Sequence, residues 1–194
     1  MLLNNNCLQA FKRHQTDLQK NDIHVFYIHL NEDMSSGLLR PEEIGMISSY
    51  LLNLNQNSKK LLLENLIAIP DYFLYTQDGS TFDIPRTVDL IGAKAFSHTK
   101  IDHLFIPGNV GVIQSLACNS NEYIEKITIE NGVRLIGDWA FGDCPRLKEL
   151  IIPPTVRYIG REITQYSEKV VIYCQRLSEA HKYAKEERLR YTFI

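Results

Sequence analysis

The chain has 194 residues, of which 44% are hydrophobic and 23% charged, and its formal net charge is −2. This length suits one elongated domain or two small ones, and the balanced charge excludes a strong general attraction to nucleic acid or to an anionic membrane. Cys7, Cys118, Cys144 and Cys174 stand apart without metal-ligand spacing, so we expect four free thiols and no bound metal or other cofactor. No apolar run reaches the roughly 18 to 20 residues of a membrane span.

The first part of the chain, residues 1–76, predicts a small α/β domain that caps the remainder. Residues 5–20 have the apolar spacing of an amphipathic helix, and residues 22–30 are rich in β-branched and aromatic side chains, which favour a strand. A further helix is expected after Pro41, and residues 72–75 predict a strand that leads into the second part of the chain. The alternative is a separate module with its own partner.

From Phe82 onward the sequence repeats itself. The apolar pairs that open each unit start 22, 23, 23 and 20 residues apart, at Phe82, Leu104, Ile127, Leu150 and Val170. A second landmark keeps a matching period, at Val88–Gly92, Val110–Gln114, Val133–Gly137 and Val156–Gly160. Such self-similarity is typical of a solenoid with one strand per turn. The second domain is therefore expected to be a solenoid over residues 77–194.

The end of the chain predicts a cover for the last turn. Leu177, Ala180 and Ala184 place small apolar side chains on one face of a helix, and the residues from Tyr191 onward are able to pair as a last strand. The fold class is therefore α/β, with a small N-terminal cap, a repeat solenoid and a closing helix.

Residues 127–150, ITIENGVRLIGDWAFGDCPRLKEL, resemble the repeat unit of the BspA-like leucine-rich repeats, which reads L-x-I-P-x-x-V-x-x-I-G-x-x-A-F-x-x-C-x-x-L. The resemblance covers residues 82 to about 172 and extends to the C-terminal cap. It implies a leucine-rich-repeat solenoid that serves as a binding scaffold without one enzymatic activity of its own. It also implies interior positions after each Ile-Gly, here Phe96, Cys118, Phe141 and Thr164, and an inward Cys144.

Two of these interior positions hold small residues, so neighbouring side chains must fill the remaining volume. The expected candidates are Leu116, Trp139 and Ile163. Gln114 stands where the other repeats have glycine, which indicates that this corner does not require a positive φ.

Side chains alternate along a strand, so the residues between the inward apolar ones face outward. The expected outward column is Asp83, Phe105, Thr128, Ile151 and Val171, with His103 and Lys126 beside it. Bulky apolar residues on an exposed sheet tend to mark contact surfaces. We therefore predict a partner-binding site of Phe105, Ile151, Val171, Thr128, His103 and Lys126. The alternative is that another part of the chain, or a second copy, covers this face.

A second candidate site is a basic patch of Arg134 and Arg157, extended by Arg161, which suits phosphate or an acidic protein. Asp89 and Gly111 occupy the same repeat position earlier and weaken this patch, so nucleic-acid binding is the minority interpretation. The sequence contains no H-E-x-x-H, G-x-S-x-G or nucleotide-binding loop, and we assign no catalytic residue and no enzymatic activity.

The sequence thus predicts a non-enzymatic protein-interaction module of bacterial or phage origin. The N-terminus lacks the apolar core of a secretion signal, which favours a cytoplasmic location. One hypothesis is an inhibitor of a host protein, encoded on a phage or mobile element. The other is an assembly subunit that associates with itself through the same sheet face.

Overall fold

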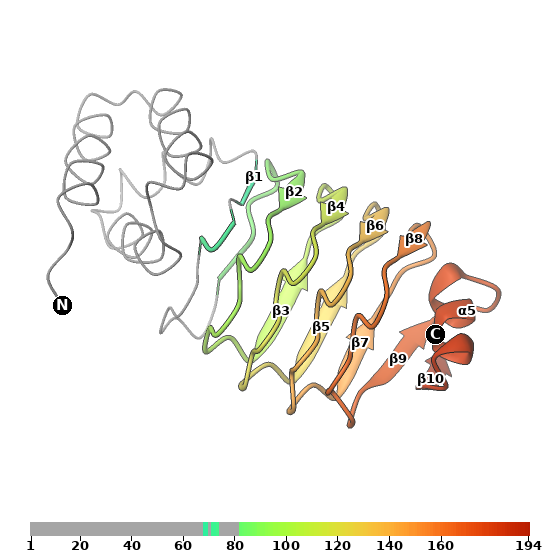
Figure 1. Cartoon of the computed structure of the whole chain (residues 1–194). Coiled ribbons are helices and arrows are strands. Elements are labelled where there is room, and N and C mark those ends of the chain that lie inside the picture. The colour runs from blue at the N-terminus through green and yellow to red at the C-terminus, as the bar shows by residue number, and fades with distance from the viewer. Residues whose placement is uncertain (1–67, 70, 74–81) are drawn as a thin grey trace, which may run out of the picture. The chain divides into compact units, whose positions relative to one another are not determined.

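The computed structural model describes residues 68–69, 71–73 and 82–194, and in this part the chain winds into a stack of parallel strands (Figure 1). The helices and strand predicted before residue 67 lie outside the described residues. The strand expected from Tyr72 is not found at residues 71–73, which form a turn. No helix among the described residues is long and apolar enough to cross a bilayer.

Each turn contributes strands to two parallel sheets, and this architecture confirms the predicted solenoid. Sheet A has the order β1-β2-β4-β6-β8, with β1 Ala68–Ile69, β2 Leu90–Ile91, β4 Val112–Ile113, β6 Leu135–Ile136 and β8 Tyr158–Ile159. Sheet B has the order β3-β5-β7-β9-β10, with β3 His103–Ile106, β5 Lys126–Ile129, β7 Glu149–Ile151, β9 Val171–Cys174 and β10 Arg190–Phe193. The first predicted repeat strand is missing, since residues 82–85 have no strand conformation, although Ile84 is buried.

The core lies between the two sheets and the turns that join them. The predicted interior residues Phe96, Cys118, Phe141 and Thr164 are all buried, with 5% exposure or less. Ile163 is buried and fills the interior as expected. Leu116 and Trp139 do not, because both are half-exposed, and both have a left-handed backbone conformation.

The tight turn after each sheet A strand from β2 to β8 contains two residues with left-handed backbone, four positions apart. The first of each pair is Lys94, Leu116, Trp139 and Glu162, and the second is His98, Ser120, Asp143 and Tyr166, with φ between 53° and 63°. None of these residues is glycine, and each costs about 1 to 2 kcal/mol relative to the right-handed region. The repeat must therefore offset this cost through packing and hydrogen bonds.

A column of buried polar side chains supplies such hydrogen bonds. Its members are Thr99, Asn121, Cys144 and Ser167. The Asn121 amide donates to the Phe96 carbonyl at 3.2 Å, and the Ser167 hydroxyl donates to the Phe141 carbonyl at 3.2 Å. The inward position predicted for Cys144 is confirmed: its thiol lies 3.4 Å from the Cys118 carbonyl oxygen. The column thus satisfies buried carbonyl groups of successive tight turns.

Glycine follows the sheet A strands β2, β6 and β8, and at these three places it is required by space and not by a positive φ. A Cβ atom on Gly137 would overlap the backbone nitrogen of Ser115 in the preceding turn. Gln114 takes the equivalent place without a positive φ, as expected, and its side-chain oxygen accepts the N–H of Ala93 at 3.1 Å.

The helix α5 Glu179–Glu186 packs at the end of the stack. Ser178 caps it by accepting the N–H of His181, and the buried face consists of Ala180, Tyr183 and Ala184. The Tyr183 hydroxyl accepts the N–H of Ile163 at 3.0 Å, and burial raises the Tyr183 pKa to about 12. Leu177 was predicted on this face but is 85% exposed, because it lies before the cap in a left-handed conformation. The predicted last strand is confirmed by the pairing of β10 with β9.

Replacing Phe141 by Ala should lower the free energy of unfolding by about 3 to 5 kcal/mol, because the ring is fully buried and the stack cannot close around the cavity. Urea unfolding of the full chain measures this change. Leu177→Ala is the matched control, since it removes an exposed apolar side chain and should change the free energy by less than about 0.5 kcal/mol. Equal effects of the two substitutions would contradict the interior position of Phe141.

The three described thiols should resist a thiol reagent in the folded protein. Burial raises the pKa of Cys118, of Cys144 (to about 12) and of Cys174, and the thiolate is the reactive form. At mildly alkaline pH we expect these three thiols to react only after denaturation. With Cys7 included, the denatured chain should contain four free thiols. Rapid reaction of two or more thiols in the folded protein would contradict this burial.

Candidate functional site

The outward face of sheet B carries two columns of side chains at neighbouring register positions. The strand pairings place Phe105, Thr128, Ile151, Tyr173 and Thr192 in one line, which we call the central column. The rim column beside it consists of His103, Lys126, Glu149, Val171 and Arg190. The outward direction predicted for Phe105, Thr128 and Ile151 is confirmed, since alternate residues of β3, β5 and β7 are buried.

Val171 was predicted in the central column, and this register is wrong. Val171 pairs with Glu149, whereas Ile151 pairs with Tyr173. The error arose because the last unit was aligned on Val170, 20 residues after Leu150, whereas Leu150 pairs with Ile172. Val171 still faces outward, in the rim column, and Tyr173 takes its place in the central column.

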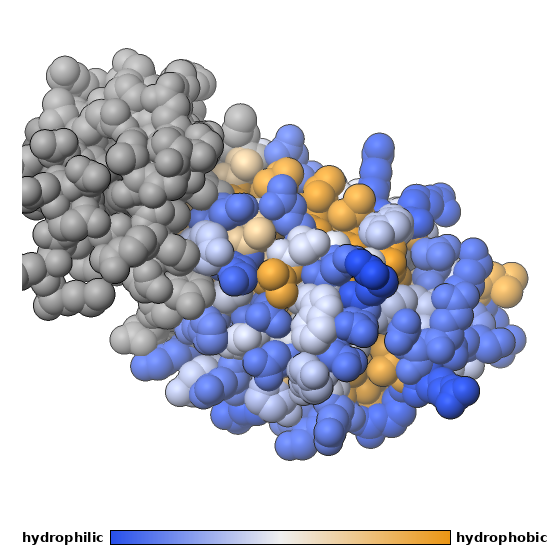
Figure 2. All heavy atoms as spheres, in the orientation of Figure 1, coloured by the Kyte–Doolittle hydropathy of each residue, from blue (hydrophilic) through white to orange (hydrophobic). Residues whose placement is uncertain are grey.

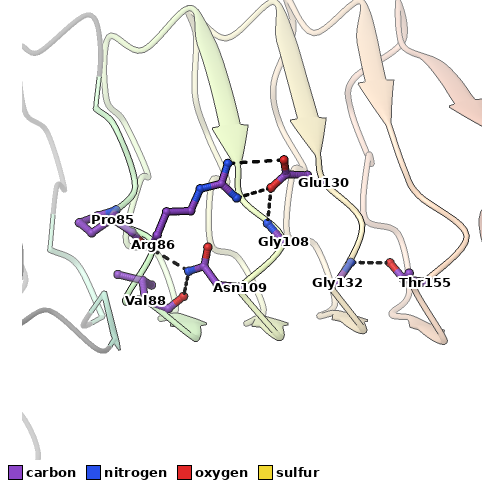
Figure 3. A network of polar contacts seen from close by, with 8 residues as sticks. All are labelled: Pro85, Arg86, Val88, Gly108, Asn109, Glu130, Gly132 and Thr155. Carbon is purple, nitrogen blue, oxygen red and sulfur yellow. Dashed lines mark hydrogen bonds and ion pairs between the residues drawn. The ribbon is translucent and has the colours of Figure 1, made fainter.

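Phe105 is an exposed member of the central column, with 49% of the residue accessible to solvent. The guanidinium of Arg86 lies over its ring, 5.9 Å from the ring centre, and also forms an ion pair with Glu130. Figure 3 shows Arg86 reaching from the first described turn to Glu130 in the third, past Gly108 in the turn between. One face of the aromatic ring is thus next to a fixed positive charge.

Arg86 belongs to a polar network at the corner that follows sheet B (Figure 3). Glu130 stands where the other repeats have proline, and its carboxylate accepts the N–H of Gly108 at 2.7 Å. The Asn109 amide donates to the carbonyl groups of Pro85 and Val88. One carboxylate oxygen of Glu130, Oε2, therefore accepts hydrogen bonds both from the Gly108 N–H in the neighbouring turn and from Arg86.

The pKa of Glu130 is lowered, first by the hydrogen bond from Arg86 and then by the bond from Gly108. A lowered pKa means that the carboxylate stabilises this corner at neutral pH, and that the stabilisation is lost as the pH falls through the folded-state value. Because the group is exposed, the effect on overall stability is small.

The rim of the sheet B face is formed by paired charges. Lys126 and Glu149 form an ion pair of 2.7 Å along the rim column. Glu125 pairs with Lys148 at 2.8 Å and with Arg146 at 2.6 Å, and the Lys148 hydrogen bond is the main cause of its lowered pKa. The apolar side chains of the face are therefore bordered by charges that neutralise one another.

The predicted basic patch is found only in part. Arg134 and Arg157 lie in adjacent turns at the same repeat position, where the Arg157 N–H donates to the Arg134 carbonyl at 2.8 Å. Arg161 lies beyond the opposite end of the sheet A strand, and its guanidinium and backbone N–H both contact Asp138, at 3.4 Å and 2.8 Å. Arg161 therefore does not extend the patch.

A separate pocket of about 370 Å³ opens at the tight turns, lined by His98, Ser120, Glu122, Asp143, Pro145 and Arg146. The Ser120 hydroxyl lies within hydrogen-bond distance of the Asn119 side-chain amide oxygen Oδ1, at 2.8 Å, and of the Asp143 carboxylate, at 3.0 Å. A nucleophilic serine instead donates to an imidazole base. The described ranges also hold no group of three or more His, Cys, Asp or Glu side chains placed to bind a metal ion.

Sequence reasoning missed Tyr173 and Arg86 at this site. Tyr173 follows from aligning the buried Ile172 with Leu150, a choice that the alternation of the strand allows. Arg86 had no local signal, because its contact with Glu130 joins residues 44 positions apart.

Parallel strands stacked one turn at a time, with a common outward face, define this chain as a repeat solenoid of the leucine-rich-repeat class. The family described as the BspA type leucine rich repeat region matches residues 41–171 in 6 copies, and the chain belongs to that family. The match begins inside the segment assigned to the N-terminal cap, so the division at residue 76 stays a prediction.

Comparison with solved structures finds similarity to a leucine-rich repeat protein from Bacteroides ovatus, with 17% sequence identity and a TM-score of 0.46. The match covers 68% of this chain and 52% of that chain, so this protein spans about half the length of the solved one. Comparison with curated proteins gave no match.

Arg86→Gln should raise the pKa of Glu130 towards its ordinary value, because the substitution removes the largest cause of the lowering. The titration of the Glu130 side-chain carboxyl, followed by NMR, measures the shift. Arg134→Gln is the matched control and should leave that titration unchanged. Identical Glu130 titrations in the wild type and in Arg86→Gln would show that the ion pair is absent in solution.

Proposed function

We propose that this protein binds a protein partner through the outward face of sheet B. The observation that supports the proposal is the half-exposed Phe105 ring, aligned with Ile151 and Tyr173 in the central column. The leucine-rich-repeat fold is commonly used for protein–protein interaction, which agrees with this use of the sheet.

The dimensions of the face suit the centre of an interface. Neighbouring strands of a sheet lie about 4.8 Å apart, so the central column from β3 to β9 spans about 14 Å. An apolar centre surrounded by polar groups is the usual anatomy of an interface, and a few central side chains carry most of its energy. In this arrangement Phe105, Ile151 and Tyr173 form the centre, Thr128 lies between them, and His103, Lys126 and Val171 form one border.

Arg86 adds a charged element to the same site. Its guanidinium already lies against Phe105 and is held by Glu130, so it costs little side-chain entropy to present to a partner. A partner with an aromatic side chain or a carboxylate opposite this corner would contact the Arg86 guanidinium, which Glu130 holds in place. The hypothesis that the partner is a host protein inhibited by this one rests on the same face and remains a prediction, as does the absence of catalysis.

Replacing Phe105 and Ile151 together by Asp should weaken partner binding by at least about 100-fold, because two central apolar side chains are lost and two charges are added. The measurement is affinity capture of partners from the native host, followed by titration of the captured protein. Both side chains point away from the core, so the variant should fold, and circular dichroism checks that it does.

Tyr166→Asp is the matched control, since it adds a charge at an aromatic side chain that is 66% exposed in a tight turn outside both sheets. This control should bind at full strength. A folded double variant that binds as well as the wild type would rule out the sheet B face as the site. If the wild type instead forms oligomers that the double variant dissociates, the partner is a second copy, and the protein is an assembly subunit.

A further inference from the structure

The outward face of sheet A is a second apolar surface. In β2, β4 and β6 the second residue is turned inward, as the full burial of Ile91, Ile113 and Ile136 shows, whereas Ile159 in β8 is half-buried. The first residues therefore face outward, and the strand pairings align Leu90, Val112, Leu135 and Tyr158, which we call the sheet A column. Figure 2 shows hydrophobic side chains gathered in this region, over β2, β4 and β6.

This column differs from the central column of sheet B in having an apolar or aromatic residue in every turn from β2 to β8. Leu90, Val112 and Leu135 are half-buried, and Tyr158 is 54% exposed. These side chains do not contribute to the core of the stack, because the residues that follow them, Ile91, Ile113 and Ile136, fill the interior. A continuous apolar line on the outside of a sheet indicates a surface that is covered by a partner.

The residues just before these strands form a charged line that changes sign along the stack. Asp89, Gly111, Arg134 and Arg157 occupy it in order, joined by backbone bonds of 2.7, 2.9 and 2.8 Å from each N–H to the carbonyl of the preceding turn. Asp89, Arg134 and Arg157 are exposed, and within the described residues their side chains form no ion pair. The line is acidic at its first turn and basic at its last.

We propose that the sheet A face binds a second copy of this chain across a two-fold axis parallel to the strands. Rotation about such an axis reverses the order of the turns and keeps the strand direction. Leu90 then meets Tyr158 of the second copy, and Val112 meets its Leu135. The charged line is also reversed, so Asp89 meets Arg157 of the second copy, and the same contact occurs twice.

Charge complementarity selects this partner over the alternatives. Asp89 and Arg157 lie three turns apart, or about 14 Å, which is too far for an ion pair within one copy. A two-fold axis along the sheet A column would instead keep the order of the turns, so Asp89 would lie three turns, or about 14 Å, from Arg157 of the second copy. An acidic foreign protein would be attracted by Arg134 and Arg157 but repelled by Asp89. In the dimer, by contrast, Asp89 forms an attractive contact with Arg157 of the second copy.

The test is sedimentation velocity of the full chain over a range of concentrations. The wild type should show a reversible monomer–dimer equilibrium. Arg157→Asp alone and Asp89→Arg alone should each raise the dimer dissociation constant by about tenfold or more, because each replaces two attractive contacts by repulsive ones. Lys169→Asp, an equal charge change at an exposed residue outside sheet A, should leave the equilibrium unchanged.

Mixing the two single variants is the decisive measurement. In a heterodimer, Arg at position 89 faces Asp at position 157, and the native Asp89 faces the native Arg157, so both contacts are attractive and dimers should return. The Phe105 and Ile151 double variant should also remain dimeric, which separates this inference from the proposed function of sheet B.

A wild type that stays monomeric at about 1 mM, a concentration at which even a weak contact is populated, would overturn the proposal. It would also be overturned if mixing the two folded variants failed to restore dimers, or if a monomeric wild type bound an acidic polypeptide such as poly-glutamate through Arg134 and Arg157.

Discussion

The whole structure depends on backbone hydrogen bonds between successive turns, which hold equivalent residues in line. Gly137 donates to Ile113 and Gly160 donates to Ile136, each at 2.8 Å, and Gly92 and Gln114 form the same bond in the two turns before them. At these two glycines a Cβ atom would overlap backbone atoms of the preceding turn, whereas Gln114 forms the equivalent bond to Ile91 at 2.9 Å with its side chain in place. Once this spacing is set, each repeat position becomes a column that runs along the stack.

The same spacing explains why unfavourable backbone conformations are tolerated. The left-handed residues of the tight turns, such as Leu116 and Trp139, donate their N–H groups to carbonyls of the next turn at 2.9 and 3.0 Å. The buried polar column adds side-chain bonds to the same segments. Each turn thus offsets about 1 to 2 kcal/mol of conformational cost per left-handed residue by hydrogen bonds between turns and by those of the buried polar column.

A stack built this way separates its surfaces from its core. Outward positions of both sheets vary without changing the buried columns, so sheet B carries an aromatic ring, Arg86 and paired rim charges, whereas sheet A carries an apolar line beside charges that have no partner within the described residues. Family membership accordingly defines the scaffold and leaves the choice of partner to the outward side chains.

The sequence by itself determined the repeat, the interior residues and the outward direction of Phe105, because burial imposes a period that is visible in the order of apolar residues. It did not determine the alignment of the last turn, where Tyr173 and not Val171 lies in the central column. The strand of Val, Ile, Tyr and Cys fits two registers, because none of its residues is strongly polar. Only the tertiary structure decided that register, the exposure of Leu177 before the cap, and the contact of Arg86 with Glu130. Those features arise from packing between turns, which brings together residues that no local pattern connects.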